Sequence, residues 1–184
     1  MISIGDVALS DARGIARIHA KAWKNTYRGI MPDEVLDGMS EEAGTPRFEA
    51  RIREHLQTKP EYPFLVAVEI IGFSHAIKPE DPTVRFDFAI KAIYVDPSFQ
   101  GLGAGTQLVL ETIERMVKQG YRSMVIWAAS QNPWRRFYEK LGGTVIDDTQ
   151  TIEVGGKQIP HTIFGWDDVA LLIGSIRRGE QAQT

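Results

Sequence analysis

Cysteine is absent from this sequence of 184 residues. Its absence excludes a disulfide framework, a thiolate metal site and a cysteine acyl-enzyme mechanism. Long apolar runs are absent as well, because no window approaches the roughly 18 residues of a membrane-spanning helix. The N-terminal segment MISIGDVALSDARG lacks the basic residues and the long apolar stretch of a signal peptide. These observations predict a cytoplasmic protein with no membrane partner.

An excess of positive charge is absent as well, since 21 lysine and arginine residues stand against 24 acidic residues and the formal net charge is −3 at pH 7. This balance argues against a dedicated nucleic-acid binder, and no cluster of charge marks a polyamine or an acidic peptide as partner. The hydrophobic fraction of 43% and the charged fraction of 24% are ordinary for a soluble protein with its own core. The length predicts a single domain over residues 1–184, with a frayed tail from about residue 176.

Hydrophobic periodicity and turn residues predict alternating strands and helices. Four helices are expected: one capped by Ser10 or Asp11, one opened by Thr45-Pro46, one that Gly120 ends, and one between Asn132-Pro133 and Gly142-Gly143. The predicted strands cover residues 2–9, 64–69, 71–77, 86–95, 123–128, 144–154 and 157–166, with a two-residue hairpin turn at Gly155-Gly156. The order predicts a mixed α/β domain and not a regular doubly wound sheet.

A glycine-rich segment, QGLGAG over residues 100–105, follows the strand that ends at Val95-Asp96-Pro97 and opens a helix. The free N–H groups and positive end of a helix N-terminus attract anions, and glycine lets a ligand approach the backbone closely. The segment therefore predicts a phosphate site, and the alternative is a tight turn that needs glycine only for packing. Thr106-Gln107 excludes a P-loop, and Thr106 also stands where a dinucleotide-binding motif requires glycine.

Two motifs support a resemblance to a known family. Gln100-x-x-Gly103-x-Gly105, after the strand, resembles motif A of the GNAT acetyltransferases. Asn132-Pro133, followed by the FYEKLG segment of residues 137–142, is similar to motif B of the same family. The order of elements is similar over residues 2–166. The resemblance implies a mixed, mostly antiparallel central sheet with flanking helices, and transfer of an acetyl group from acetyl-CoA to a primary amine.

The resemblance also implies which residues hold acetyl-CoA, and it implies no metal. The loop amides should bind the pyrophosphate, and the strand before the loop should splay from the strand over residues 123–128 and pair with the pantetheine arm. The residues concerned are Ile93, Tyr94, Val95, Gln100, Gly101, Leu102, Gly103, Ala104, Gly105, Thr106 and Asn132. Asn132 suits a helix cap equally well, and it precedes Tyr138 by one residue fewer than in many relatives, so Gln131 could take the expected contact.

Amide formation from a thioester needs a proton for the leaving thiolate. Tyr138 can donate it, because a tyrosine has a pKa of about 10 and is therefore protonated at neutral pH, while the leaving thiol has a pKa of about 8.5. The resemblance places Tyr138 near the thioester sulfur as the general acid. From helical spacing alone, with Trp134 and Leu141 on the same face, Tyr138 could instead be a core aromatic.

The general base and the acceptor site are less defined. Many relatives carry a glutamate on the central strand, which this sequence lacks, so the base candidates are Asp87, which alternation places on the face of Ala89, Glu69, His19, His75 and a water chain. Trp23 and Tyr27, with Arg28, lie where the resemblance implies an acceptor-binding segment, and Trp23 could equally be buried.

The acceptor, a small-molecule or peptide amine, is not identified, and the family leaves a homodimer open. Two other functions are considered. One is a module that binds acyl-CoA without catalysis, and the other is a Rossmann-like nucleotide binder, against which the loop sequence counts.

Overall fold

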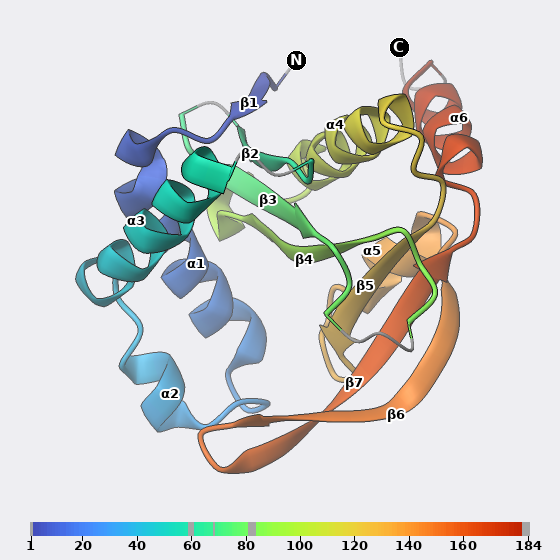
Figure 1. The fold of residues 1–184 in the computed structure, drawn as a ribbon. Coiled ribbons are helices and arrows are strands. Elements are labelled where there is room, and N and C mark those ends of the chain that lie inside the picture. The colour runs from blue at the N-terminus through green and yellow to red at the C-terminus, as the bar shows by residue number, and fades with distance from the viewer. Residues whose placement is uncertain (1, 59–60, 68, 81–83, 182–184) are drawn as a thin grey trace.

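One seven-stranded sheet runs through the protein (Figure 1). The computed structural model describes residues 2–58, 61–67, 69–80 and 84–181. Neighbouring strands in the sheet are antiparallel except β4 and β5, which are parallel. The strands, in spatial order, are β1(Ile4–Asp6), β2(Phe64–Ala67), β3(Gly72–Ile77), β4(Phe88–Val95), β5(Met124–Ala129), β7(Lys157–Trp166) and β6(Thr144–Val154). The predicted mixed, mostly antiparallel α/β fold is confirmed.

Helices cover both faces of the sheet. They are α1(Ala12–Tyr27), α2(Asp33–Asp37), α3(Glu41–Thr58), α4(Ala104–Lys118), α5(Arg135–Lys140) and α6(Val169–Gln181), with short 3-10 turns η1(Leu9–Asp11) and η2(Pro97–Phe99). Helices α1 and α3 pack over one face around Ile15, Phe48 and Phe73, while α4 and α6 lie side by side on the other, over Phe88 and Phe164 (Figure 1). Within the described ranges, no helix is long and apolar enough to cross a membrane.

Glycine ends two helices as the sequence predicts. Gly120 follows α4 with φ +92°, its N–H donates to the carbonyl of Val117, and the N–H of Tyr121 donates to the carbonyl of Met116. Gly142 follows α5 with φ +77°, and the N–H of Gly143 donates to the carbonyl of Tyr138. Both are Schellman motifs, which need a left-handed residue after the helix. The second one fixes the backbone of Tyr138.

The predicted start of α3 is wrong. The helix begins at Glu41, and the Ser40 hydroxyl accepts the N–H of Ala43 as an N-cap does. Thr45 is inside the helix and donates its hydroxyl to the carbonyl of Glu41. Pro46 is therefore an interior proline, which costs a helix about 3 kcal/mol. The helix forms in spite of this cost because Phe48 and Ile52 bury its inner side.

The end of the chain also differs from the prediction. The sequence predicts a frayed tail from about residue 176, whereas α6 continues to Gln181. Ile176 is buried under this helix, and Arg177 forms an ion pair of 2.7 Å with Glu114 on α4. The part of the predicted tail over residues 182–184 lies outside the described residues. Packing against α4, rather than local sequence preference, accounts for the helix.

A β-bulge divides β4 into two halves. Ala76 of β3 lies opposite Ile90, but the preceding His75 lies opposite Ala92, so Lys91 is an extra residue. Because of this extra residue, the even-numbered side chains after the bulge lie on the opposite face of the sheet from the even-numbered side chains before it. Phe88 and Ile90 therefore face α4, while Ala92 and Tyr94 face α1 and α3.

Candidate active site

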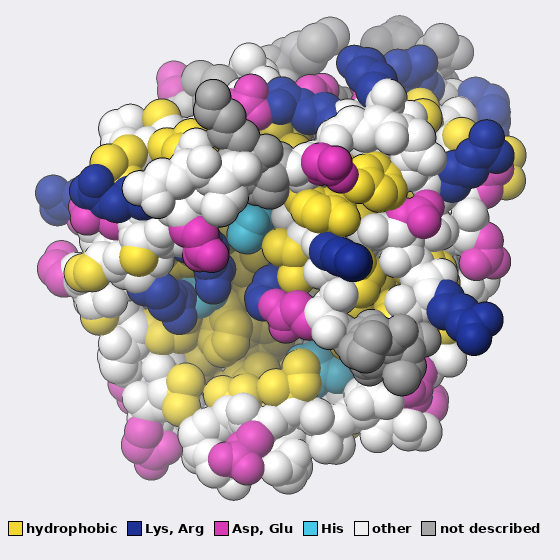
Figure 2. Space-filling view, viewed as in Figure 1, with side chains coloured by type: hydrophobic (Ala, Val, Ile, Leu, Met, Phe, Trp, Pro, Cys, Tyr) yellow, Lys and Arg dark blue, Asp and Glu magenta, His cyan; other side chains and the backbone are white. Residues whose placement is uncertain are grey.

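The sheet opens between β4 and β5. The two strands pair only at Phe88 with Met124 and at Ala89 with Val125, and beyond these residues they separate. The opening is part of a cleft of about 900 Å³, lined by β4, β5, the ends of α1 and α5, and the loop before α4. Figure 2 shows a hollow on the face of the molecule seen in Figure 1, with an apolar floor and with basic and histidine side chains around it. The separation of these two strands, which the resemblance implies, is therefore observed.

The glycine-rich loop forms one end of the cleft. Gly101 and Gly103 have φ values of +78° and +86°, which side chains with a Cβ rarely adopt. Gly103 is the N-cap of α4, and the first helical hydrogen bond runs from the N–H of Gln107 to its carbonyl. The N–H groups of Ala104, Gly105 and Thr106 precede that bond, so they have no helical partner. All residues from Gln100 to Thr106 line the cleft, which makes this helix end suited to an anion.

Two residues of the loop have roles that the sequence did not show. Gly105 lies within α4 beside the Phe137 ring of α5, and a Cβ there would lie 3.5 Å from that ring, an ordinary contact distance, so the position is part of the contact between α4 and α5 and has room for a Cβ. The Gln100 side chain donates to the carbonyl of Val95 at 3.2 Å and ties the loop to the end of β4.

The turn after β4 has a second anchor. Lys21 of α1 donates to both carboxylate oxygens of Asp96, at 2.8 and 3.0 Å, and to the hydroxyl of Ser98. Asp96 also accepts the N–H of Ser98. The loop is therefore fixed to α1 as well as to β4.

The second half of β4 forms the wall of the cleft. Ile93, Tyr94 and Val95 all line it. On one edge they face β3, with Ser74, Phe73 and Gly72 as partners in register. On the edge toward β5 the described strands leave them unpaired, because pairing with β5 ends at Ala89. Apart from the Val95 carbonyl, which accepts the Gln100 side chain, backbone polar groups on this edge are free among the described strands to bind an extended ligand.

Tyr138 lies at the inner end of the cleft. Only 7% of its surface is exposed, and its ring packs against Phe137 and Phe164 with 5.5 Å between centroids in each case. Burial, with a smaller contribution from Tyr94, raises the pKa of Tyr138 above its usual value. The side chain therefore holds its proton across the neutral range, and none of the described residues is hydrogen-bonded to its hydroxyl.

Asn132 joins two parts of the cleft. Its side-chain oxygen accepts the N–H of Trp134 at 2.9 Å, which caps the turn before α5, and the helix itself begins at Arg135. Its amide donates to the hydroxyl of Tyr27 at 3.4 Å. Asn132 and Tyr27 are buried and line the cleft, and burial raises the pKa of Tyr27.

Trp23 does not line the cleft. Its ring packs edge-on against Tyr27 at 5.1 Å and lies 5.2 Å from His19, so it supports the cleft wall from behind. Its indole nitrogen is buried without a hydrogen-bond partner among the described residues. Two residues, Trp23 and Tyr27, were predicted on the acceptor side. Tyr27 lines the cleft, whereas Trp23 contacts Tyr27 without lining the cleft.

The base candidates from the sequence do not line the cleft. Asp87 precedes β4 and accepts the N–H groups of Arg122 and Ser123 at 2.6 and 2.9 Å, which fixes the start of β5. Glu69 is exposed on the turn after β2. Burial, with nearby positive charges, lowers the pKa of both His19 and His75 to about 3. No aspartate, glutamate or histidine is among the described residues that line the cleft.

Several residues that line the cleft were not predicted from the sequence. Lys91 enters the cleft because it is the bulged residue of β4, which the sequence does not mark. Arg136 and Lys140 lie one helical turn apart on α5 at the same cleft, and their spacing of four is a signal that could have been used. Trp127 and Trp134 complete the apolar lining. Within the described ranges, no group of three or more histidine and acidic side chains has the arrangement of a metal site.

Two parallel strands that separate beside a glycine-rich helix start form a cleft of the kind found in acyltransferases. The sequence match identifies the family. Residues 21–143 match the Acetyltransferase (GNAT) family, and this chain belongs to it. It is 24% identical over 175 residues to the uncharacterized N-acetyltransferase YuaI of Bacillus subtilis (strain 168), covering 94% of this chain and 96% of YuaI.

Solved structures share the fold. PaiA N-acetyltransferase from Thermoplasma acidophilum, in complex with coenzyme A, has a TM-score of 0.68 and 22% identity, covering 91% of this chain and 99% of that protein. The structure of yncA from Salmonella typhimurium, with its cofactor acetyl-CoA, has a TM-score of 0.67 and 22% identity, covering 90% and 93%.

Proposed function

We propose that residues 1–184 form one acetyltransferase domain, which moves the acetyl group of acetyl-CoA to a primary amine of a small molecule or peptide. The observation that carries this proposal is the separation of β4 from β5 beyond Ala89 and Val125, directly beside the glycine-rich start of α4. Membership of the GNAT family supports the reaction class. Two similar proteins that were crystallised with coenzyme A or acetyl-CoA support the choice of co-substrate.

The cleft residues suit the parts of coenzyme A. The N–H groups of Ala104, Gly105 and Thr106 would hold the pyrophosphate at the positive end of α4. The free edge of β4 at Ile93 and Val95 would hold the amide groups of the pantetheine arm. Arg136 and Lys140 would hold the remaining phosphate at the mouth of the cleft, since both side chains line it.

Tyr138 would protonate the departing sulfur. Bound acetyl-CoA would supply an acetyl group as a thioester, which a neutral amine attacks directly. The Tyr138 hydroxyl keeps its proton at neutral pH because burial raises its pKa, and it lines the cleft without a hydrogen-bond partner among the described residues. No acidic or histidine side chain lines the cleft in the described residues, so we propose that the amine loses its proton to water.

The test is a screen of primary amines with acetyl-CoA, in which release of free coenzyme A is measured. We expect turnover with at least one amine class and acetyl-CoA binding without any amine. The alternative is a module that binds acyl-CoA without catalysis. Tight acetyl-CoA binding in calorimetry together with no coenzyme A release from any amine would support that alternative.

A further inference from the structure

Two arginines lie side by side on α3. Arg47 and Arg51 are one turn apart, and their guanidinium carbons lie 5.1 and 5.7 Å from the centroid of the Phe48 ring. Neither has a carboxylate within 4.0 Å among the described residues, whereas Arg53 on the same helix lies 3.9 Å from Glu49. Like charges one turn apart destabilise a helix slightly, although both guanidinium groups also gain a cation–π contact with Phe48.

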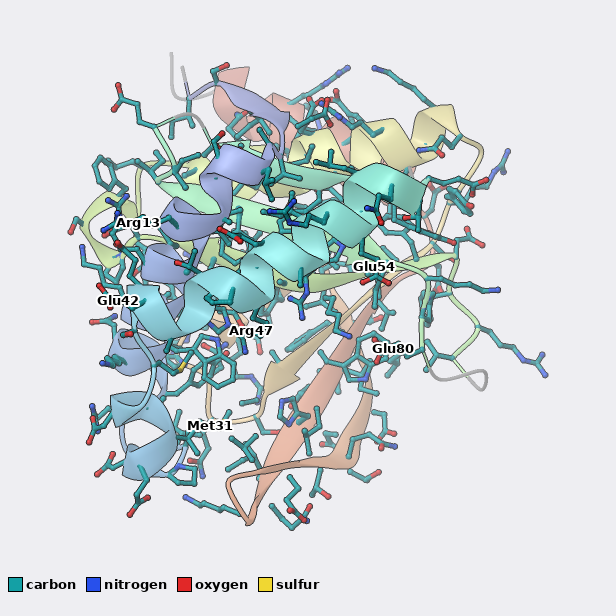
Figure 3. The ribbon with its side chains drawn as sticks, turned by 60° about the vertical axis from the view of Figure 1, so that its left-hand side comes forward. Arg13, Met31, Glu42, Arg47, Glu54 and Glu80 are labelled. Carbon is teal, nitrogen blue, oxygen red and sulfur yellow. The ribbon has the colours of Figure 1, made fainter. Side chains whose placement is uncertain are left out.

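Ring contacts connect this arginine pair to the cleft. Arg47 donates to Nδ1 of His19 at 3.4 Å, and the His19 ring lies 5.1 Å from the ring of Tyr94, which lines the cleft. Burial raises the pKa of Tyr94, and the charges of Arg47 and Arg51 are among the effects that act against this increase. Figure 3 shows Arg47 beneath α3, on the side that faces β5 and β7.

The charge around the pair is positive. Lys91 lines the cleft and is paired with Glu80, so the charges of these two cancel. Glu54, further along α3, is the other carboxylate that acts on Arg51 (Figure 3). Arg47 and Arg51 therefore place two positive charges one turn apart, with no carboxylate within 4.0 Å among the described residues, in a chain whose net charge is −3. An anionic group of a ligand would complete this arrangement.

We propose that Arg47 and Arg51 bind a carboxylate of the acceptor, so that the acceptor is a small amine that also carries a carboxylate group. Arginine suits this task because its planar guanidinium donates two parallel hydrogen bonds to a carboxylate. Arg47 and Arg51 do not themselves line the cleft. They lie over the Phe48 ring, which contacts His19, and His19 in turn contacts Tyr94 in the cleft wall. This inference rests on the proposed function, since it names the substrate class of the same site.

The experiment compares amino acids with the same amines lacking the carboxylate. The pairs are leucine and isopentylamine, β-alanine and ethylamine, γ-aminobutyrate and propylamine, and ε-aminocaproate and pentylamine. We expect kcat/KM at least 10-fold higher for the acid in one or more pairs, because a hydrogen bond to a charged group typically contributes that much. The best chain length reports the separation between the arginines and the reacting nitrogen.

Variants test the assignment to the arginines. In Arg47→Gln with Arg51→Gln the preference for the acid should be lost, while kcat/KM for the neutral amine stays within about 2-fold. Arg53→Gln is the matched control and should keep the preference. Equal rates for acid and neutral amine in every pair, or a preference that survives the double variant, would overturn the proposal. A stronger preference for aminoethylphosphonate than for β-alanine would overturn the carboxylate assignment.

A binding measurement separates this proposal from the proposed function. If no amine releases coenzyme A, the proposed function fails, and the arginine pair is tested by calorimetry with N-acetyl-leucine and N-acetyl-β-alanine on the protein loaded with coenzyme A. Binding that the double variant loses and Arg53→Gln keeps supports the carboxylate site. No binding to the natural sequence overturns it.

Discussion

The side-chain amide of Asn132 donates a hydrogen bond to the hydroxyl of Tyr27 across 3.4 Å, although the two residues are 105 positions apart in the sequence. Tyr27 is the last residue of α1, and Asn132 caps the turn that leads to α5 and Tyr138. The bond therefore links the end of α1, on the proposed acceptor side of the cleft, to the segment that carries the proposed acid. Both residues are buried, so solvent does not replace the bond if one partner is removed.

Tyr27→Phe should lower the free energy of unfolding by about 1 kcal/mol, because the buried amide of Asn132 loses its acceptor. Urea unfolding measures this change. Tyr121→Phe is the matched control, since it removes a hydrogen bond to Glu61 at an exposed position and should change stability by less than about 0.5 kcal/mol. Equal effects of the two substitutions would contradict the structural role of the Asn132–Tyr27 bond.

Tyr138→Phe should lower kcat by about 100-fold or more, the usual contribution of a positioned acid, and leave the Kd for acetyl-CoA unchanged. The ring contacts with Phe137 and Phe164 are kept by phenylalanine, so the fold should survive. Steady-state kinetics and calorimetry give the two values. Tyr62→Phe, a half-buried tyrosine outside the cleft lining, is the control and should leave kcat unchanged. A kcat near that of the natural sequence would exclude Tyr138 as the acid.

Gly103→Ala should lower stability by about 1–2 kcal/mol and weaken acetyl-CoA binding, because alanine is strained at φ +86°. A Cβ at this position would meet no other atom within 4 Å, so strain and not a clash is the cause. Thermal unfolding and calorimetry measure the two effects. Gly179→Ala in α6 has the same open space without a positive φ and should be neutral or slightly stabilising. Unchanged acetyl-CoA binding in Gly103→Ala would show that the loop does not hold the ligand.

Stability should fall as the pH decreases from about 6.5 toward 3. The pKa of His75 is lowered to about 3 in the folded chain, chiefly by burial, so below pH 6.5 the unfolded chain binds a proton that the folded chain does not. The loss for this residue should be about 2 kcal/mol between pH 7 and pH 5. His75→Phe keeps an aromatic ring against Phe64 and should reduce the pH dependence measured by urea unfolding. His19 titrates in the same way, so part of the dependence should remain.

The motifs predicted the glycine-rich start of α4, where we propose that acetyl-CoA binds, because its conformational requirements are local. A left-handed backbone at Gly101 and Gly103 needs glycine, and the helix start follows directly in the sequence. The turn glycines Gly120 and Gly142 were predictable for the same reason. Positive φ values at Gly155 and Gly156 likewise agree with the predicted hairpin turn.

The other features depend on tertiary contacts, which the sequence does not show. Thr45-Pro46 has the pattern of a helix start, but Ser40 caps α3 five residues earlier, and the packing of Phe48 supports the longer helix. The sequence could not show that two of the base candidates lie outside the cleft lining, where Asp87 accepts backbone N–H groups at the start of β5 and His75 stacks on Phe64. The bulge at Lys91 also changes which side chains share a face, so simple alternation along β4 could not place them.

Because of the bulge at Lys91, the side chains of the single strand β4 are divided into two sets that pack against different helices. Side chains at Phe88, Ile90 and Ile93 belong to the core under α4, where a change of volume would require neighbours to repack. Those at Ala92 and Tyr94 face α1 and α3 instead. Substitutions at these two positions can therefore change the face toward α1 and α3 while the α4 core stays intact. Deletion of Lys91 would make the pairing with β3 regular and leave both sets of side chains on their present faces, because Ile90 and Ala92 already lie opposite the consecutive residues Ala76 and His75.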